Sequence, residues 1–455
     1  MQAMLCTRSV CLRQMAQGDW AAYMAYWRFV NNPQVTTDQL IEGWSRQTAT
    51  VVSGRHVLAI QDTSEVKFQT RQGRRRGLGK VGKGNAHGVL LHAMMAVDAD
   101  SGACLGLTSG KVWTRRGKVK TPHDERELAN KESARWVTTA EQGCEVLAAA
   151  RMITVINDRE GEFFAHWALT PGDNAHLLTR AMHDHALADG RTLYQAVERA
   201  RFCDKAVIDL PQRMDRHGRR AHLSLRFGTV ALKRPARPGV KDLPERVEVS
   251  FVEVVELHPP KGAEPVHWLL LTSHSIANAA DAWRIVSWYR QRWIIEQLFR
   301  SLKNQGLRIE DSQLDRAEAL IKLVAIATKV ACIVIQLVQA RNGGEQLPVK
   351  CAFTPEEIEA LAAINKTMKG RTELQKNPHH PYTLQSAAWI IASADGPATP
   401  RIGHPDQSPS TTEWLASKSS SLAEPSKMCR NTSASGERGK KSGIARYHSR
   451  AIMPA

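Results

Sequence analysis

The chain has 455 residues and a formal net charge of +17. A chain of this length can bury a large core and form more than one domain. The positive charge favours a polyanionic partner, and we find no apolar run of the roughly 18 residues that would cross a bilayer, so DNA or RNA is expected and a membrane is not. The eight cysteines are scattered, with no CxxC pair and no zinc-ligand spacing, as is typical of reduced cytoplasmic thiols.

The first elements expected are helices over residues 19–50. Residues 19–32 are aromatic-rich and amphipathic, and Thr37 can cap a second helix after the break at Pro33. The apolar run HVLAIQD then predicts a short strand that ends on Asp62. A carboxylate after a strand is more often a turn or cap residue than a catalytic one, so the run alone leaves the role of Asp62 open.

A basic tract follows, RQGRRRGLGKVGKG, in which Arg74, Arg75 and Arg76 lie among glycines with no acidic residue. Such a tract cannot pack in a core, so it is either a solvated loop or an arm along a DNA backbone, and the net charge favours the arm. Residues 88–107 then predict a hairpin around the turn at 98–102. With the Asp62 strand, the hairpin gives three consecutive strands.

A helix is expected over residues 131–150, and the next apolar strand ends on Asp158 in the pattern D-R-E-G. Two buried strands that each end on Asp, separated by a hairpin and a helix, suit a ribonuclease-H-like α/β fold in which the strand ends meet. The strand HLLTRA follows and carries Arg180. Asp173 and Asp184 have no comparable context and are predicted to lie at the surface.

Residues 184–265 change in character, because apolar and polar residues alternate at period two between turns rich in Pro, Gly and Arg. This alternation predicts an antiparallel β insertion. The insertion ends in VHWLLLTS, a strand expected to return to the main sheet with Trp268 at its head. A tryptophan in such a place is usually a core residue.

A single helix is predicted from about 282 to 304. Its apolar residues crowd one side, and its other face gathers one carboxylate among cations and aromatic rings. That face consists of Tyr289, Arg292, Trp293, Glu296, Arg300 and Lys303. A basic surface stripe with an incidental Glu would look the same, but a lone carboxylate among cations also suits metal ions held by the carboxylate and phosphates held by the cations.

The spacing of Tyr289, Arg292, Glu296 and Lys303 is Y-x2-R-x3-E-x6-K. This signature resembles that of the DDE cut-and-paste transposases of the insertion-sequence-four group, which includes the transposon-five transposase, and the resemblance extends over roughly residues 26–391. It implies a catalytic triad of Asp62, Asp158 and Glu296 that holds two Mg²⁺ ions, for which Mn²⁺ can substitute.

The resemblance also assigns DNA contacts. Tyr289, Arg292, Lys303 and Arg180 would bind DNA, and Trp268 would take up a base flipped from the DNA end. Trp293 and Arg300 face the same way and are weaker candidates.

The sequence patterns and the resemblance together predict a division of the chain, in which the tail is predicted to be disordered because its composition is of low complexity and has no periodicity. The expected parts are a remnant of a helical DNA-recognition region (1–50), the first part of a ribonuclease-H-like mixed sheet flanked by helices (51–184), the β insertion (185–265), the rest of the catalytic domain (266–344), a partial helical pairing region (345–393) and a disordered tail (394–455).

The expected function is cleavage at transposon ends and strand transfer into target DNA through a hairpin intermediate, in a bacterial cytoplasm at the nucleoid. The partners would be double-stranded DNA and, if the C-terminal region suffices, a second copy in the synaptic complex. Two alternatives remain open at the level of sequence. One is a metal-dependent nuclease without strand transfer, and the other is a non-catalytic or inhibitory DNA-binding protein derived from a transposase.

Overall fold

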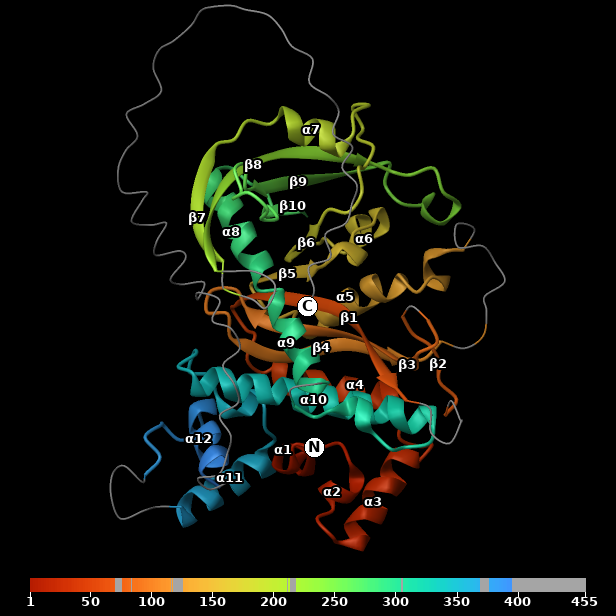
Figure 1. Cartoon of the computed structure of the whole chain (residues 1–455), viewed down its shortest axis with the longest axis vertical. Coiled ribbons are helices and arrows are strands. Elements are labelled where there is room, and N and C mark those ends of the chain that lie inside the picture. Colours follow the sequence, from red (N-terminus) through yellow and green to blue (C-terminus); the bar gives the residue numbers. More distant parts are fainter. Residues whose placement is uncertain are drawn as a thin grey trace, which may run out of the picture. The chain divides into compact units, whose positions relative to one another are not determined.

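The protein is examined as a computed structural model that describes residues 1–394 apart from 70–75, 83, 116, 118–125, 211, 213–217, 304, 305 and 369–375 (Figure 1). Arg74, Arg75 and the expected disordered tail lie outside the described residues, except that the first residue of the predicted tail, Ala394, ends the last helix.

A single mixed sheet forms the centre of the chain. Its strands are β1 (His56–Phe68), β2 (Gly79–Lys80), β3 (His87–Asp98), β4 (Cys104–Trp113), β5 (Met152–Asn157), β6 (Ala175–Arg180), β7 (Asp204–Leu210), β8 (Arg219–Lys233), β9 (Arg246–Val255) and β10 (His267–Thr272). The order is β2-β3-β1-β5-β6-β10-β9-β8-β7, and β4 also pairs with β3.

The part of the sheet that carries the predicted aspartates has ribonuclease-H-like topology, as expected. The three strands β1, β3 and β4 are antiparallel neighbours, and β5 and β6 continue the sheet parallel to β1. The hairpin of β3 and β4 is confirmed. The segment 185–265 contains β7, β8 and β9 in antiparallel pairing, and β10 joins them to β6, so these strands continue the main sheet.

The described helices are α1 (Gln2–Thr7), α2 (Leu12–Met15), α3 (Trp20–Asn31), α4 (Thr37–Thr48), α5 (Ala134–Val146), α6 (Phe164–Leu169), α7 (Leu193–Arg199), α8 (Ala279–Arg290), α9 (Trp293–Leu302), α10 (Ala317–Arg341), α11 (Pro355–Thr367) and α12 (Leu384–Ala394). Short 3₁₀ turns are η1 (Leu128–Asn130), η2 (Arg159–Gly161), η3 (Pro238–Val240), η4 (Ile309–Asp311) and η5 (Val349–Cys351).

The cap of α4 differs by one residue from the prediction. Thr36, not Thr37, is the N-cap, and it forms a capping box in which its side chain accepts from the Gln39 amide and the Gln39 side chain accepts from the Thr36 amide. The reciprocal pair satisfies two otherwise unpaired amides, which is why the helix begins after Thr36.

The prediction of a single helix over 282–304 is wrong, because the structure has two helices in this range. The helix α8 ends at Arg290 and α9 begins at Trp293. Between them the hydrogen bonds tighten, since the Arg292 amide bonds to Tyr289 oxygen and the Ile295 amide bonds to Arg292 oxygen. The two helices pack differently, α8 on β6, β8 and β9, and α9 on β1 and α10. A continuous helical pattern in sequence does not reveal such a break.

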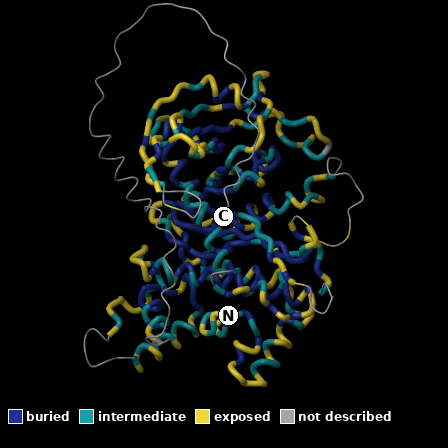
Figure 2. The backbone as a smooth tube through the Cα atoms, in the orientation of Figure 1, coloured by how far each residue is buried: buried dark blue, intermediate teal, exposed yellow. Residues whose placement is uncertain are grey.

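The helix α10 packs against β3, β4 and several helices, and most of its residues are buried. By length and composition it could cross a membrane, contrary to our sequence expectation, but 72% of its most apolar window is buried inside the protein. Two buried lysines on it, Lys322 and Lys329, donate to the backbone oxygens of Asn32 and Trp44 near the ends of α3 and α4. Figure 2 shows the buried residues concentrated on the sheet and α10, whereas much of α3 and α11 is exposed.

Candidate active site

The two predicted aspartates lie where β1 extends beyond its parallel neighbour. The pairing of β1 with β5 ends at Ile60 and Ile156, after which β1 pairs with β3 alone. Asp62 therefore lies within β1, not at its end as predicted, and beside the turn that begins with Asp158. The Asp62 carboxylate accepts from the Thr63 amide at 2.7 Å, and the Asp158 carboxylate accepts from the Glu160 amide at 2.8 Å.

Glu296 enters from α9, and Arg292 connects it to Asp62. The Arg292 guanidinium donates to Asp62 Oδ2 at 3.0 Å and to Glu296 Oε1 at 2.5 Å. The side chains of Arg292, Asp62 and Glu296 are 18%, 15% and 14% exposed. The break between α8 and α9 places Arg292 at the start of α9, with Glu296 one turn further along. One guanidinium thus joins a strand residue to a helix residue distant in sequence.

The carboxylates act on one another electrostatically. Burial, and after it the charge of Asp158, raise the pKa of Asp62 from 3.8 to about 8, although Arg292 opposes the shift. The other Glu296 oxygen, Oε2, is buried without a hydrogen-bond partner. Carboxylate oxygens that repel one another at a buried site are ligands that hard divalent cations prefer, and Glu296 Oε2 has no competing donor.

The donor set of Asp62, Asp158 and Glu296 therefore fits Mg²⁺ or Mn²⁺ chemically. Among the residues that the structure describes, no three His, Cys, Asp or Glu side chains are already arranged to hold a metal ion. The guanidinium of Arg292 lies between two of the three carboxylates and supplies the local positive charge. The sequence predicts Arg292 as a DNA ligand, whereas its contact with both carboxylates is found only in the structure.

An aromatic and cationic wall adjoins the carboxylates. Tyr289 is buried, its pKa is raised to about 12 by that burial, and its ring meets Trp268 edge to face at 5.7 Å. Arg180, at the end of β6, donates to the backbone oxygen of His267 at 2.8 Å, and burial lowers its pKa. Trp268 is half-buried and lies one residue inside β10. Tyr289 is thus less accessible than its place on the predicted polar face suggested.

The remaining predicted cations are held by the protein itself. Lys303 donates to Ser64 at 2.7 Å, beyond Asp62 on the same strand, and burial lowers its pKa. The Arg300 guanidinium lies over the Trp293 ring, 4.9 Å from the ring centroid. Arg76, expected in a DNA-tracking arm, instead donates to the backbone oxygens of Ser312 and Leu314.

Sequence reasoning missed a group of polar residues on the opposite face of β1. Gln61 and Thr63 flank Asp62, and both bind His92 of β3. Arg135 of α5 donates to Thr63 as well. The alternation of side chains along a strand would have placed Gln61 and Thr63 on the face opposite to Asp62, but nothing in the pattern indicated their partners.

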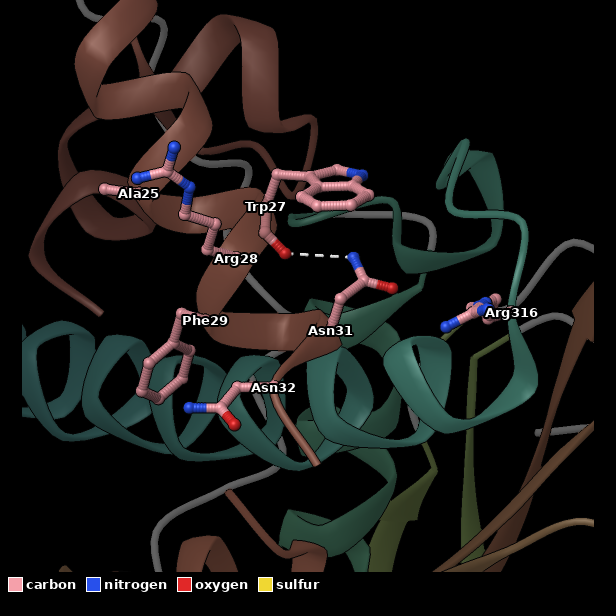
Figure 3. A pocket seen from close by; sticks show the side chains of 7 residues that line it. All are labelled: Ala25, Trp27, Arg28, Phe29, Asn31, Asn32 and Arg316. Carbon is pink, nitrogen blue, oxygen red and sulfur yellow. Dashed lines mark hydrogen bonds between the residues drawn. The ribbon is translucent and has the colours of Figure 1, made fainter. Parts of the chain in front are cut away.

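A hollow of about 510 Å³ lies elsewhere, at the end of α3 (Figure 3). It is lined by Ala25, Trp27, Arg28, Phe29, Asn31, Asn32 and Arg316. Trp27 and Phe29 are 44% and 45% exposed, and Asn31 donates to the Trp27 backbone oxygen at 2.9 Å. None of the lining residues belongs to the predicted catalytic set.

Residues 165–329 match the family model of the transposase DDE domain. The matched segment holds the whole Y-x2-R-x3-E-x6-K signature with Glu296, whereas Asp62 and Asp158 precede it. The match supports a transposase of the DDE type.

Among solved structures, the chain is similar to that of the piggyBac transposase in a synaptic complex with hairpin DNA, with 10% sequence identity and a TM-score of 0.33. The similarity covers 83% of this chain and 63% of that chain, so the chain spans less than two thirds of the length of that protein.

Proposed function

We propose that this chain is a DNA transposase that cuts transposon ends and joins them to target DNA by metal-dependent phosphoryl transfer. The observation that carries the proposal is the Asp62–Arg292–Glu296 bridge. The bridge links the carboxylate of Asp62 on β1 to that of Glu296, which lies in the segment that matches the transposase DDE domain. The charge of Asp158 also raises the pKa of Asp62. The signature spacing supports the finer assignment to the insertion-sequence-four group, with a hairpin intermediate.

Asp62, Asp158 and Glu296 would hold two Mg²⁺ ions, and Mn²⁺ would substitute. When bound there, such ions would lower the pKa of an attacking water or 3′-hydroxyl and would stabilise the leaving oxygen. The protein fixes the carboxylates, with one oxygen each of Asp62 and Asp158 accepting from a backbone amide. Cleavage and strand transfer then use one site with different nucleophiles.

The cations around the site would bind the DNA backbone. Arg292 presents a planar guanidinium suited to bidentate phosphate contact, and Lys303 presents a point charge. Arg180 interacts electrostatically with Tyr289, whose ring meets that of Trp268, and Lys303 contacts Ser64 on β1. The half-buried Trp268 ring would stack on a base displaced from the DNA end.

The hollow on α3 would add a DNA contact in the N-terminal region. Arg28 and Arg316 supply positive charge, Trp27 and Phe29 supply exposed ring faces, and no acidic residue lines the hollow. This combination suits a phosphate backbone and unstacked bases. The helix α11, which has no buried residue, and α12 would serve the pairing of two copies.

One assay tests the function. Purified protein is incubated with labelled transposon-end duplexes, supercoiled plasmid and Mg²⁺, and the products are resolved on denaturing and native gels. We expect nicked ends, hairpins and joined products, all abolished by Glu296→Gln. Cleavage without joining would favour a nuclease. Binding without cleavage in either Mg²⁺ or Mn²⁺ would refute an enzymatic role and favour a DNA-binding derivative.

A further inference from the structure

Arg135 connects the two segments that carry the predicted aspartates. Its Nε donates to Thr63 Oγ1 at 3.0 Å, and its Nη2 donates to Glu160 at 3.2 Å. Thr63 is the residue after Asp62, and Glu160 is the second residue after Asp158. The backbone amides of these same two residues donate to the aspartate carboxylates. A single guanidinium therefore holds both residues that orient Asp62 and Asp158.

The Thr63 side of this connection continues into a directional chain of hydrogen bonds. Burial keeps the pKa of His92 well below its ordinary value, so the ring is neutral. Gln61 donates its amide to the Trp136 backbone oxygen at 3.1 Å, which leaves its own oxygen to accept from His92 Nε2 at 3.0 Å. His92 Nδ1 then accepts from the Thr63 hydroxyl at 2.8 Å, and that hydroxyl accepts from Arg135.

Every donor in this chain has one acceptor, and the chain begins at Arg135 and ends at the backbone of the next residue, Trp136. The guanidinium of Arg135 also lies over the Trp136 ring at 5.3 Å, donates to the Glu132 backbone oxygen, and has a side chain only 11% exposed. A fully satisfied buried network of this kind fixes its members in one geometry. Here the fixed members are the residues on both sides of Asp62.

We infer that Arg135 is a positioning residue for the active site, which sets the orientation of Asp62 and Asp158 through Thr63 and Glu160. The inference rests on the proposed function, in which these two carboxylates bind metal. Residues that orient metal ligands from behind typically change metal affinity by ~10–100-fold when replaced. Arg135 is bound on all sides by the protein and is not expected to contact DNA.

The test measures Mn²⁺ binding by the DNA-free protein, from the electron paramagnetic resonance signal of free Mn²⁺. Arg135→Gln and Thr63→Val should each weaken Mn²⁺ binding by ~10-fold or more. Thr63→Ser retains the hydroxyl and should bind Mn²⁺ like the wild type. Arg191→Gln, which removes a partly exposed arginine paired with Asp189, is the matched control and should change nothing. Affinity for end DNA in EDTA should be unaltered in all four variants.

The outcomes separate the inference from the function. Wild-type Mn²⁺ affinity in folded Arg135→Gln and Thr63→Val would overturn the inference, provided that Asp62→Asn abolishes Mn²⁺ binding. If Arg135→Gln fails to fold, the comparison of Thr63→Val with Thr63→Ser decides alone. A wild-type protein that neither binds Mn²⁺ nor cuts end DNA would refute the proposed function itself, and the inference with it.

Discussion

Replacing Asp62 with Asn should stabilise the folded protein while it removes a proposed metal ligand. Burial and the charge of Asp158 raise the pKa of Asp62 from 3.8 to about 8, against the attraction of Arg292. At neutral pH the folded carboxyl thus keeps its proton, whereas in the unfolded chain the same carboxyl ionises about three pH units lower. This difference lowers the free energy of unfolding at neutral pH by ~4 kcal/mol. Because the side chain is 15% exposed, water relieves part of this cost, and we expect a gain of ~2 kcal/mol.

The sign of the pH dependence follows from the raised pKa. Between about pH 4 and about pH 8 the unfolded carboxyl is ionised and the folded one is not, so the wild type loses stability as pH rises through this window. The Asn variant has no such loss. The free energy of unfolding in urea and EDTA, followed by tryptophan fluorescence, should therefore favour the variant increasingly towards about pH 8.

Asp173→Asn is the control for this experiment, because Asp173 is an exposed carboxylate and its replacement should leave the pH dependence unchanged. A variant no more stable than the wild type at about pH 8, or a difference largest at about pH 5, would show that Asp62 is not desolvated in the folded protein.

Three further predictions concern DNA and the core. Lys303→Ala and Arg180→Ala should each lower the salt slope of end binding by about 1, measured by fluorescence anisotropy across a salt series, and unchanged slopes in both would exclude phosphate contacts. Trp268→Ala should weaken the complex with a cleaved end by ~1–3 kcal/mol and Trp268→Phe by less, as measured by gel shift; full affinity in the alanine variant would exclude base stacking. Trp44→Phe should destabilise the protein by ~1–3 kcal/mol in urea, because Trp44 is fully buried and its indole donates to Ala325 oxygen at 3.0 Å; no change would mean that the site repacks without loss.

Sequence patterns predicted most strands and helices in their order, and together with the family resemblance they led to the proposal of Asp62, Asp158 and Glu296 as site residues. Apolar runs that stop near Asp62 and Asp158 are local patterns, and two strands with parallel direction bring such residues to one edge whatever the packing details. The signature around Glu296 was equally local, because residues three and four apart on a helix share a face. These features depend on short-range periodicity, which a sequence displays directly.

How those residues are held depends on contacts that exist only in the folded chain. The break before Trp293 arises because α8 and α9 pack on different strands, and a helical pattern continues across it unchanged. Glu296 is only one helical turn from Arg292. In contrast, Asp62 is far along the chain from Arg292, and Thr63 and Glu160 are far from Arg135. Such partners are chosen by distance and burial in the folded state, and no spacing along the sequence encodes them.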